Sequence, residues 1–296
     1  MINKNNMPTW VADILLLIVA LLWGGGFIGV NVAVNNVPPL YMTSIRFAIA
    51  AFLLIVIFFK NIKGFTKKDL IAGIITGTFL FLGTLLQTIA AKNVPVGKLA
   101  FLTALNVVIV PFLAFILYKG KLSIKNILSS ILALLGIAVL NLKGGTLEGF
   151  QKGDILAILC AFCFAGQIVA LGHFSKEVEP LRLTAFQLVA ASVFSFAGAI
   201  LFETPPNNLT LDVLGALLYL GIFSTFLAFS LQTIGQKYTS PERASVIMCL
   251  ESVFAAIFGV ILLKEILTLN MIIGCSLIFL GILLAEWKGT NKNKVN

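Results

Sequence analysis

The residue with the clearest chemical potential in this sequence is a single glutamate inside a long apolar segment. Glu251 is flanked by Met248-Cys249-Leu250 and Val253-Phe254-Ala255. An ionisable side chain in such a segment costs at least a few kcal/mol unless it is paired, neutralised or turned toward a water-filled cavity, and burial favours the neutral form of a carboxyl group. Glu251 is therefore a candidate proton site and a candidate anchor for a polar ligand. The alternative is a structural carboxyl group that is hydrogen-bonded to a neighbouring segment.

Arg46 is the other charged residue that lies well inside an apolar segment. Counted from opposite faces of a hydrocarbon layer about 30 Å thick, the depths of Arg46 and Glu251 differ by roughly 10 Å, which two long side chains can bridge. Arg46 is thus a candidate ion-pair partner of Glu251 or part of a gate. In the alternative, its guanidinium extends toward the membrane surface or hydrogen-bonds to backbone carbonyls.

Three amides and two aromatic residues complete the set of predicted ligand contacts. Asn106, Gln87 and Gln232 supply donors and acceptors that would orient a polar or zwitterionic solute. Ordinary hydrogen bonding between helices is the alternative for each amide. Trp23 and Phe27 share one helix face at i, i+4 spacing and are predicted to form an apolar wall beside the amides.

The sequence has none of the motifs that predict catalysis. A phosphate loop, an HExxH motif, a paired acidic cluster for a metal and a nucleophile elbow are all missing. Four cysteines lie in apolar runs, where a thiol behaves as a small hydrophobic group: Cys160, Cys163, Cys249 and Cys275. We therefore expect no catalytic residue, no metal and no cofactor, and the chain is not predicted to be an enzyme.

Composition places the chain in a membrane. Of its 296 residues 59% are hydrophobic and 11% are charged, against roughly 25% charged in a soluble domain. A spanning helix needs about 20 apolar residues, and a lipid-exposed backbone must satisfy its own hydrogen bonds. We predict an all-α integral membrane protein with ten transmembrane helices near 11–34, 39–59, 69–91, 97–117, 124–142, 153–174, 181–202, 211–236, 243–263 and 269–287. Pro111 is predicted to kink the fourth helix and is a hinge candidate.

The basic residues predict the orientation of the chain. The net charge is +9, but Lys and Arg are scattered over short connections rather than gathered on one face, so nucleic acid is not an expected partner. With the N-terminus inside, fifteen basic residues fall on the inner side and five on the outer side, the latter being Lys92, Lys98, Lys143, Lys152 and Lys264. Cytoplasmic segments carry the excess of Lys and Arg, so both termini are predicted to be cytoplasmic.

The chain contains an internal repeat. Leu86-Gln87-Thr88-Ile89 recurs as Leu231-Gln232-Thr233-Ile234, and the same offset of 145 pairs Asn106 with Glu251. An offset of 141 pairs Arg46 with Gln187. We predict a first five-helix repeat (1–142), a linker (143–152), a second repeat (153–287) and a cytoplasmic tail (288–296). Because five is odd, the second repeat enters the membrane from the opposite side, so the repeats are predicted to be inverted, as in many secondary transporters.

Several short segments resemble one family. They are Leu22-Trp23-Gly24-Gly25-Gly26-Phe27, Arg46-Phe47-Ala48, Leu250-Glu251-Ser252-Val253-Phe254-Ala255, and Lys264-Glu265 followed by Gly274 and Gly281. In this order they resemble the EamA-type members of the drug/metabolite transporter superfamily. The chain departs from the pattern at Ser252, where the family usually has Pro, and at Lys264, where it usually has Gly.

The resemblance implies a secondary carrier in a bacterial cytoplasmic membrane, typically an exporter of amino acids, related metabolites or other small organic solutes. We predict alternating access around a midplane cavity, with Glu251 as the polar anchor and candidate for proton coupling. A passive channel or uniporter for small polar solutes is the alternative. The expected partners are a small-molecule substrate and the lipid bilayer, and the choice between monomer and homodimer stays open.

Overall fold

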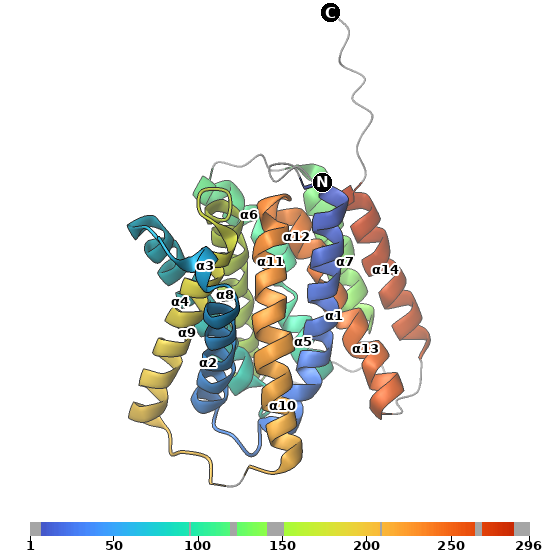
Figure 1. Cartoon of the computed structure of the whole chain (residues 1–296). Coiled ribbons are helices and arrows are strands. Elements are labelled where there is room, and N and C mark those ends of the chain that lie inside the picture. The colour runs from blue at the N-terminus through green and yellow to red at the C-terminus, as the bar shows by residue number, and fades with distance from the viewer. Residues whose placement is uncertain are drawn as a thin grey trace, which may run out of the picture.

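The computed structural model describes residues 7–94, 96–118, 123–140, 151–207, 209–263 and 268–286. Every regular element in these ranges is a helix (Figure 1). This agrees with the predicted all-α membrane fold. Most of the predicted linker (143–152) and the whole predicted tail (288–296) lie outside the described residues.

Six helices are long and apolar enough to cross a bilayer within the described ranges. They are α1 (Thr9–Ala33), α2 (Pro39–Ile57), α4 (Lys67–Ala90), α8 (Lys152–Phe174), α9 (Pro180–Phe202) and the continuous run Leu211–Lys237. This last run comprises α10 (Leu211–Gly221), a π-helical stretch η1 (Ile222–Leu227) and α11 (Ala228–Lys237). Their bounds agree with six of the predicted segments to within a few residues.

The remaining helices are shorter. They are α3 (Phe59–Ile62), α5 (Val96–Thr103), α6 (Asn106–Tyr118), α7 (Ile124–Leu140), α12 (Pro241–Met248), α13 (Leu250–Leu263) and α14 (Leu269–Glu286). The prediction of continuous helices over 97–117 and 243–263 is wrong, because the first is interrupted between α5 and α6 and the second at Cys249. Both interruptions contain tightened turns, in which Leu105 N donates to Leu102 O (3.3 Å) and Ser252 N donates to Cys249 O (3.1 Å).

Pro111 does not cause the interruption in this part of the chain. It lies inside α6, which continues as helix from Asn106 to Tyr118. The break at Ala104 and Leu105 comes about two helical turns earlier. The predicted kink site is therefore displaced from the break that the structure shows, and a hinge role for Pro111 stays a prediction.

Helix ends are fixed by side chains that satisfy free backbone donors. Thr66 and Asp69 form a capping box at the start of α4. Glu203, at the end of α9, accepts hydrogen bonds from Leu40 N (3.0 Å) and Tyr41 N (3.1 Å) at the start of α2. These caps lie at opposite ends of the bundle. We call the end where α1 begins and α14 finishes (Figure 1) the N-terminal end.

Glycines allow the backbones of several helices to approach closely. A Cβ atom added to Gly136 in α7 would lie 2.7 Å from Gly274 O and 2.7 Å from Ile278 N in α14. A Cβ on Gly281 in α14 would lie 2.9 Å from Ser129 O. Because both obstacles are backbone atoms, the helices would have to separate to admit a side chain. Small residues at such contacts are typical of helix packing in membranes.

We predict that Gly136→Ala destabilises the protein by about 1–3 kcal/mol, the usual cost of overpacking, despite the better helix propensity of alanine. Gly215→Ala in α10 is the matched control, because a Cβ there meets nothing within 4 Å. The measurement is the midpoint of thermal unfolding of purified protein in detergent. A midpoint for Gly136→Ala equal to that of the control would contradict the α7–α14 contact.

Candidate functional site

A cavity lies in the middle of the bundle and contains about 830 Å³ of empty space, including the part open to solvent. Its wall is built from both halves of the sequence and includes residues of α1, α2, α4, α5, α6, α8, η1, α11, α12 and α13. The polar lining residues are Arg46, Thr84, Gln87, Thr103, Asn106, Gln167, Ser224, Gln232, Ser245 and Glu251. Large apolar side chains, among them Trp23, Phe27, Phe164 and Phe229, cover the rest of the wall.

The structure brings the predicted ligand contacts together around this cavity. All six of them line it, namely Trp23, Phe27, Gln87, Asn106, Gln232 and Glu251. Arg46 lines it as well, whereas Pro111 does not. Their contact with a solute stays a prediction, but their convergence from α1, α2, α4, α6, α11 and α13 is a property of the fold.

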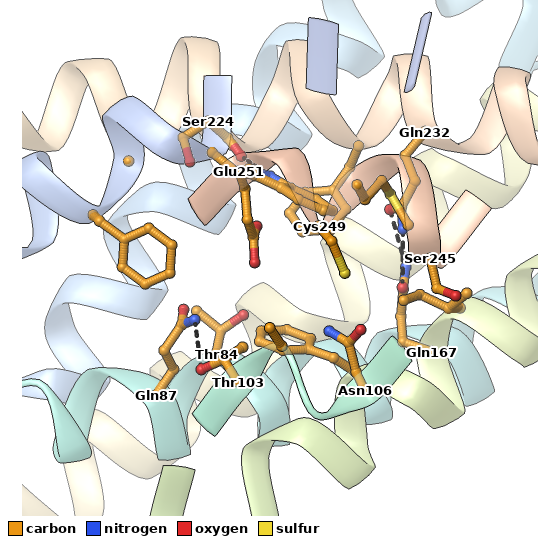
Figure 2. A pocket seen from close by; sticks show the side chains of 18 of the residues that line it. Thr84, Gln87, Thr103, Asn106, Gln167, Ser224, Gln232, Ser245, Cys249 and Glu251 are labelled. Atoms are coloured by element: carbon orange, nitrogen blue, oxygen red, sulfur yellow. Dashed lines mark hydrogen bonds between the residues drawn. The ribbon is translucent and has the colours of Figure 1, made fainter. Parts of the chain in front are cut away.

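Glu251 stands in the first turn of α13, directly after the interruption at Cys249. Figure 2 shows its carboxyl group pointing into the cavity, with Gln87, Thr84 and Thr103 on the facing wall. The residue is 9% exposed, and no side chain or backbone group of the described chain donates a hydrogen bond to it. The interpretation of Glu251 as a structural carboxyl group tied to a neighbouring helix is therefore not supported.

The glycines of α1 explain how Glu251 reaches this place. A Cβ on Gly24 would lie 2.7 Å from Phe254 Cβ and 3.0 Å from Glu251 O. A Cβ on Gly26 would lie 2.7 Å from Ser224 Oγ. The glycines thus let α1 pack closely against both α13 and η1, and place Trp23 and Phe27 at the cavity wall.

Arg46 does not form the predicted ion pair with Glu251. Its Nε donates to Thr225 Oγ1 (2.9 Å) and its Nη2 to Ser224 Oγ (3.4 Å), and no ion pair joins it to Glu251 in the described structure. The physical reason is the π-helical stretch η1, which directs two hydroxyl groups toward α2. The indole Nε1 of Trp23 donates to Ser224 O (3.0 Å) on the same stretch. Neither η1 nor its hydroxyls were predicted from the sequence.

Gln87 and Gln232 belong to two separate hydrogen-bonded groups. Gln87 Nε2 lies 3.5 Å from Thr103 Oγ1 and donates to it. Gln232 is hydrogen-bonded to Gln167 in both directions, at 3.3 and 3.4 Å, and Gln167 Nε2 also donates to Gln187 Oε1 (3.4 Å). Gln167 was missed in the sequence, although a polar residue inside the apolar run 153–174 is the same signal that identified Gln87.

Further contacts lie between this amide cluster and the N-terminal end of the bundle. Gln236 Nε2 donates to Ile168 O (3.2 Å). Arg243, at the start of α12, binds the carboxylate of Asp13 in α1 through Nε (3.0 Å) and Nη2 (2.5 Å). Ten residues of α1 separate Asp13 from Trp23, or about 15 Å by helix rise. These polar contacts lie on the N-terminal side of the amide cluster, and Asp13 is a residue that the sequence analysis missed.

Comparison with known proteins identifies the family. The model of the EamA-like transporter family matches residues 10–142 and again residues 151–287. The chain belongs to the EamA-like transporter family. The resemblance seen in the sequence motifs is thereby confirmed, and the chain is a multi-pass membrane protein of a transporter family rather than of an enzyme family.

Several relatives of this EamA-like chain cover nearly its whole length. A protein of Archaeoglobus fulgidus named an uncharacterized transporter is 33% identical over 275 residues, which are 93% of this chain and 85% of the relative. The uncharacterized transporter YoaV of Bacillus subtilis is 24% identical over 90% of this chain and 94% of its own. A protein of known crystal structure shares the fold with a TM-score of 0.78 at 22% identity, covering 93% of this chain and 96% of the other.

We predict that Asp13→Asn opens the N-terminal side of the cavity, because it leaves the Arg243 guanidinium without its carboxylate. Cys249 lines the cavity and reports access when Cys160, Cys163 and Cys275 are replaced by alanine. A membrane-impermeant thiol reagent applied from the N-terminal end should label Cys249 several-fold faster in Asp13→Asn.

Lys68→Met is the matched control for this experiment. The pair between Lys68 Nζ and Glu177 Oε2 (2.9 Å) is more exposed than the pair between Arg243 and Asp13, and exposed pairs contribute little. Labelling in Lys68→Met should equal that in the parent protein. Equal rates in all three proteins would show that the contact between Asp13 and Arg243 does not limit access.

Proposed function

We propose that this EamA-like protein is a secondary active transporter that moves small organic solutes by alternating access of its central cavity. The observation that carries the proposal is the cavity itself, which both family-matched segments line and in which Glu251 has no protein partner among the described residues. A polar anchor in a largely apolar pocket is the common design of a small-molecule site.

In this proposal the chain has ten spans in two inverted repeats, residues 1–142 and 153–287, joined by a linker at 143–152. Two observations support it. The helix interruptions at Ala104 and Cys249 are 145 residues apart, the offset that pairs Gln87 with Gln232 in the sequence. In addition, α1 runs away from the N-terminal end of the bundle whereas α8 runs toward it (Figure 1), as opposite insertion of the halves requires.

We assign the protein to a bacterial cytoplasmic membrane with both termini in the cytoplasm. The start of α1 and the end of α14 share one end of the bundle (Figure 1). Most of the basic residues in the described ranges lie in or beside the connections at that end, including Lys63, Lys67, Lys68, Arg182 and Arg243. The excess of Lys and Arg in cytoplasmic segments supports this orientation.

The proposed solutes are amino acids or related metabolites, which the transporter would export. The cavity offers amide groups to a polar headgroup and aromatic rings to an apolar side chain. Glu251 is the proposed site of proton coupling, because its carboxyl group lines the cavity without a partner in the described structure and would exchange a proton when the cavity hydrates. The polar layers at the N-terminal end disfavour the alternative of a continuously open channel.

We predict that Glu251→Gln abolishes proton-driven transport. In proteoliposomes, a panel of labelled amino acids should show saturable counterflow with the parent protein, and an imposed proton gradient should drive accumulation. In Glu251→Gln the amide cannot bind and release a proton, so gradient-driven accumulation should fall by at least about tenfold while some counterflow remains.

Asp212→Asn is the matched control, because Asp212 is an exposed carboxylate in the first turn of α10. It should leave both gradient-driven accumulation and counterflow at the parent level. If Glu251→Gln keeps the parent pH profile, the proton role is wrong and the carrier is a uniporter or uses another ion. Single-channel currents would instead indicate the channel alternative.

A further inference from the structure

We propose that Arg46, held on the hydroxyl groups of η1, is the receptor for the carboxylate group of the transported solute. The inference rests on the proposed transport function and specifies one part of the solute. It also assigns Arg46 a role other than the ion pair or gate that its sequence position suggested.

The first argument is that no ion pair balances the charge of Arg46 within the described part of the chain. Its side chain is buried, with the residue 5% exposed, and buried charged residues are almost always paired. The hydrogen-bond partners of its guanidinium are the neutral hydroxyls of Thr225 and Ser224, and the ring of Phe47 lies 5.8 Å from its Cζ atom. Within the described chain no carboxylate forms an ion pair with it. A carboxylate of the solute would therefore supply the counter-ion that Arg46 lacks in the described structure.

The second argument is geometric. A guanidinium has five N–H donors, and two hydrogen bonds to η1 leave three without a partner in the described structure. Arg46 lines the cavity, so these donors are available to a solute there. The short bond from Nε to Thr225 fixes the plane of the group, and Trp23 in turn holds Ser224 O. A planar fork held in one orientation suits the two oxygens of a carboxylate.

The third argument concerns the other charge in the same cavity. Glu251 projects from α13 and Arg46 from α2, yet the two do not form an ion pair. Once Glu251 has released its proton, a solute with a carboxylate near Arg46 and an ammonium group near Glu251 would satisfy both groups, whereas the carboxylate of Glu251 would repel a dianion such as a phosphate ester. The structure thus favours zwitterions with separated charges. Such a solute would also connect α2 with α13, which belong to different family-matched segments.

The experiment uses two sets of three probes. Within each set the probes carry the same hydrocarbon side chain and differ in their charged groups. The first set is leucine, isopentylamine (leucine without its carboxylate) and 4-methylpentanoate (leucine without its amine). The second set is phenylalanine, phenethylamine and 3-phenylpropanoate. Each probe is titrated into the purified full-length protein in detergent, and the rise in unfolding midpoint gives its apparent Kd. This measurement does not depend on transport.

We expect the parent protein to bind the amino acid of at least one set roughly tenfold or more tightly than the matching amine. In Arg46→Gln the amino acid should lose roughly 10- to 100-fold in affinity, while the amine keeps its affinity. Retained amine binding shows that the variant is folded. The affinity of Arg46→Lys for the amino acid should lie between those of the parent protein and Arg46→Gln. Lysine keeps the positive charge but lacks the planar pair of donors.

The variant Thr225→Val distinguishes a carboxylate-binding role of Arg46 from a purely structural role. It removes the partner of Arg46 Nε and leaves the charge in the cavity, so the preference for the amino acid over the amine should persist. If Arg46 only stabilises the contact between α2 and η1, both variants will lower the unfolding midpoint without ligand, and neither will change the preference.

Three outcomes would overturn the carboxylate site. They are equal affinity of the parent protein for amino acid and amine, an unchanged preference in Arg46→Gln, and no binding of any of the six probes. Counterflow of other solutes in proteoliposomes would then still support the proposed transport function. Absence of counterflow together with selective binding that depends on Arg46 would instead count against transport and leave the site intact.

Discussion

The hydrocarbon interior of a membrane offers no hydrogen-bond partner to a free backbone N–H or C=O group, and the architecture of this protein depends on that constraint. Each described regular element is a helix, which satisfies these groups within itself. At helix ends, where donors are left over, side chains accept from them, as Asp69 does at α4 and Glu203 at α2. Pro38 and Pro39, which lack the donor, stand where α2 begins.

The same constraint explains where the backbone departs from the α-helix. Irregular backbone at membrane depth is tolerated where it lines a cavity. The interruptions at Ala104 and Cys249 and the π-helical stretch η1 all contribute residues to the central cavity, including Thr103, Ser224 and Glu251. A π-helical stretch inside a longer helix is frequently found at functional sites. The irregular segments therefore expose or adjoin some of the polar groups of the cavity wall, whereas regular helices supply others, such as Gln87 and Gln232.

Charged side chains inside the bundle are found in two different arrangements. Asp13 and Arg243 neutralise each other near the N-terminal end, where their pairing links α1 to α12. Arg46 and Glu251 line the cavity without forming an ion pair in the described structure. An unpaired charge in a poorly solvated place is costly, and the proposed solute would reduce that cost at Arg46. Glycines make the arrangement possible, because Gly24 and Gly26 let α1 approach α13 and η1 closely.

The sequence by itself determined the membrane environment, the all-helical class, the approximate bounds of the six long helices and the family. It also identified several residues of the cavity wall, because a polar side chain such as Gln87 or Glu251 in an apolar run is conspicuous. These properties follow from the composition and residue spacing within single segments of the chain. Only the tertiary structure decided the helix breaks at Ala104 and Cys249, the π-helical stretch, the separation of Arg46 from Glu251, and the pairing of Asp13 with Arg243. Each of these depends on atoms that lie far apart in the chain, so helix packing, rather than any local pattern, selects the partners.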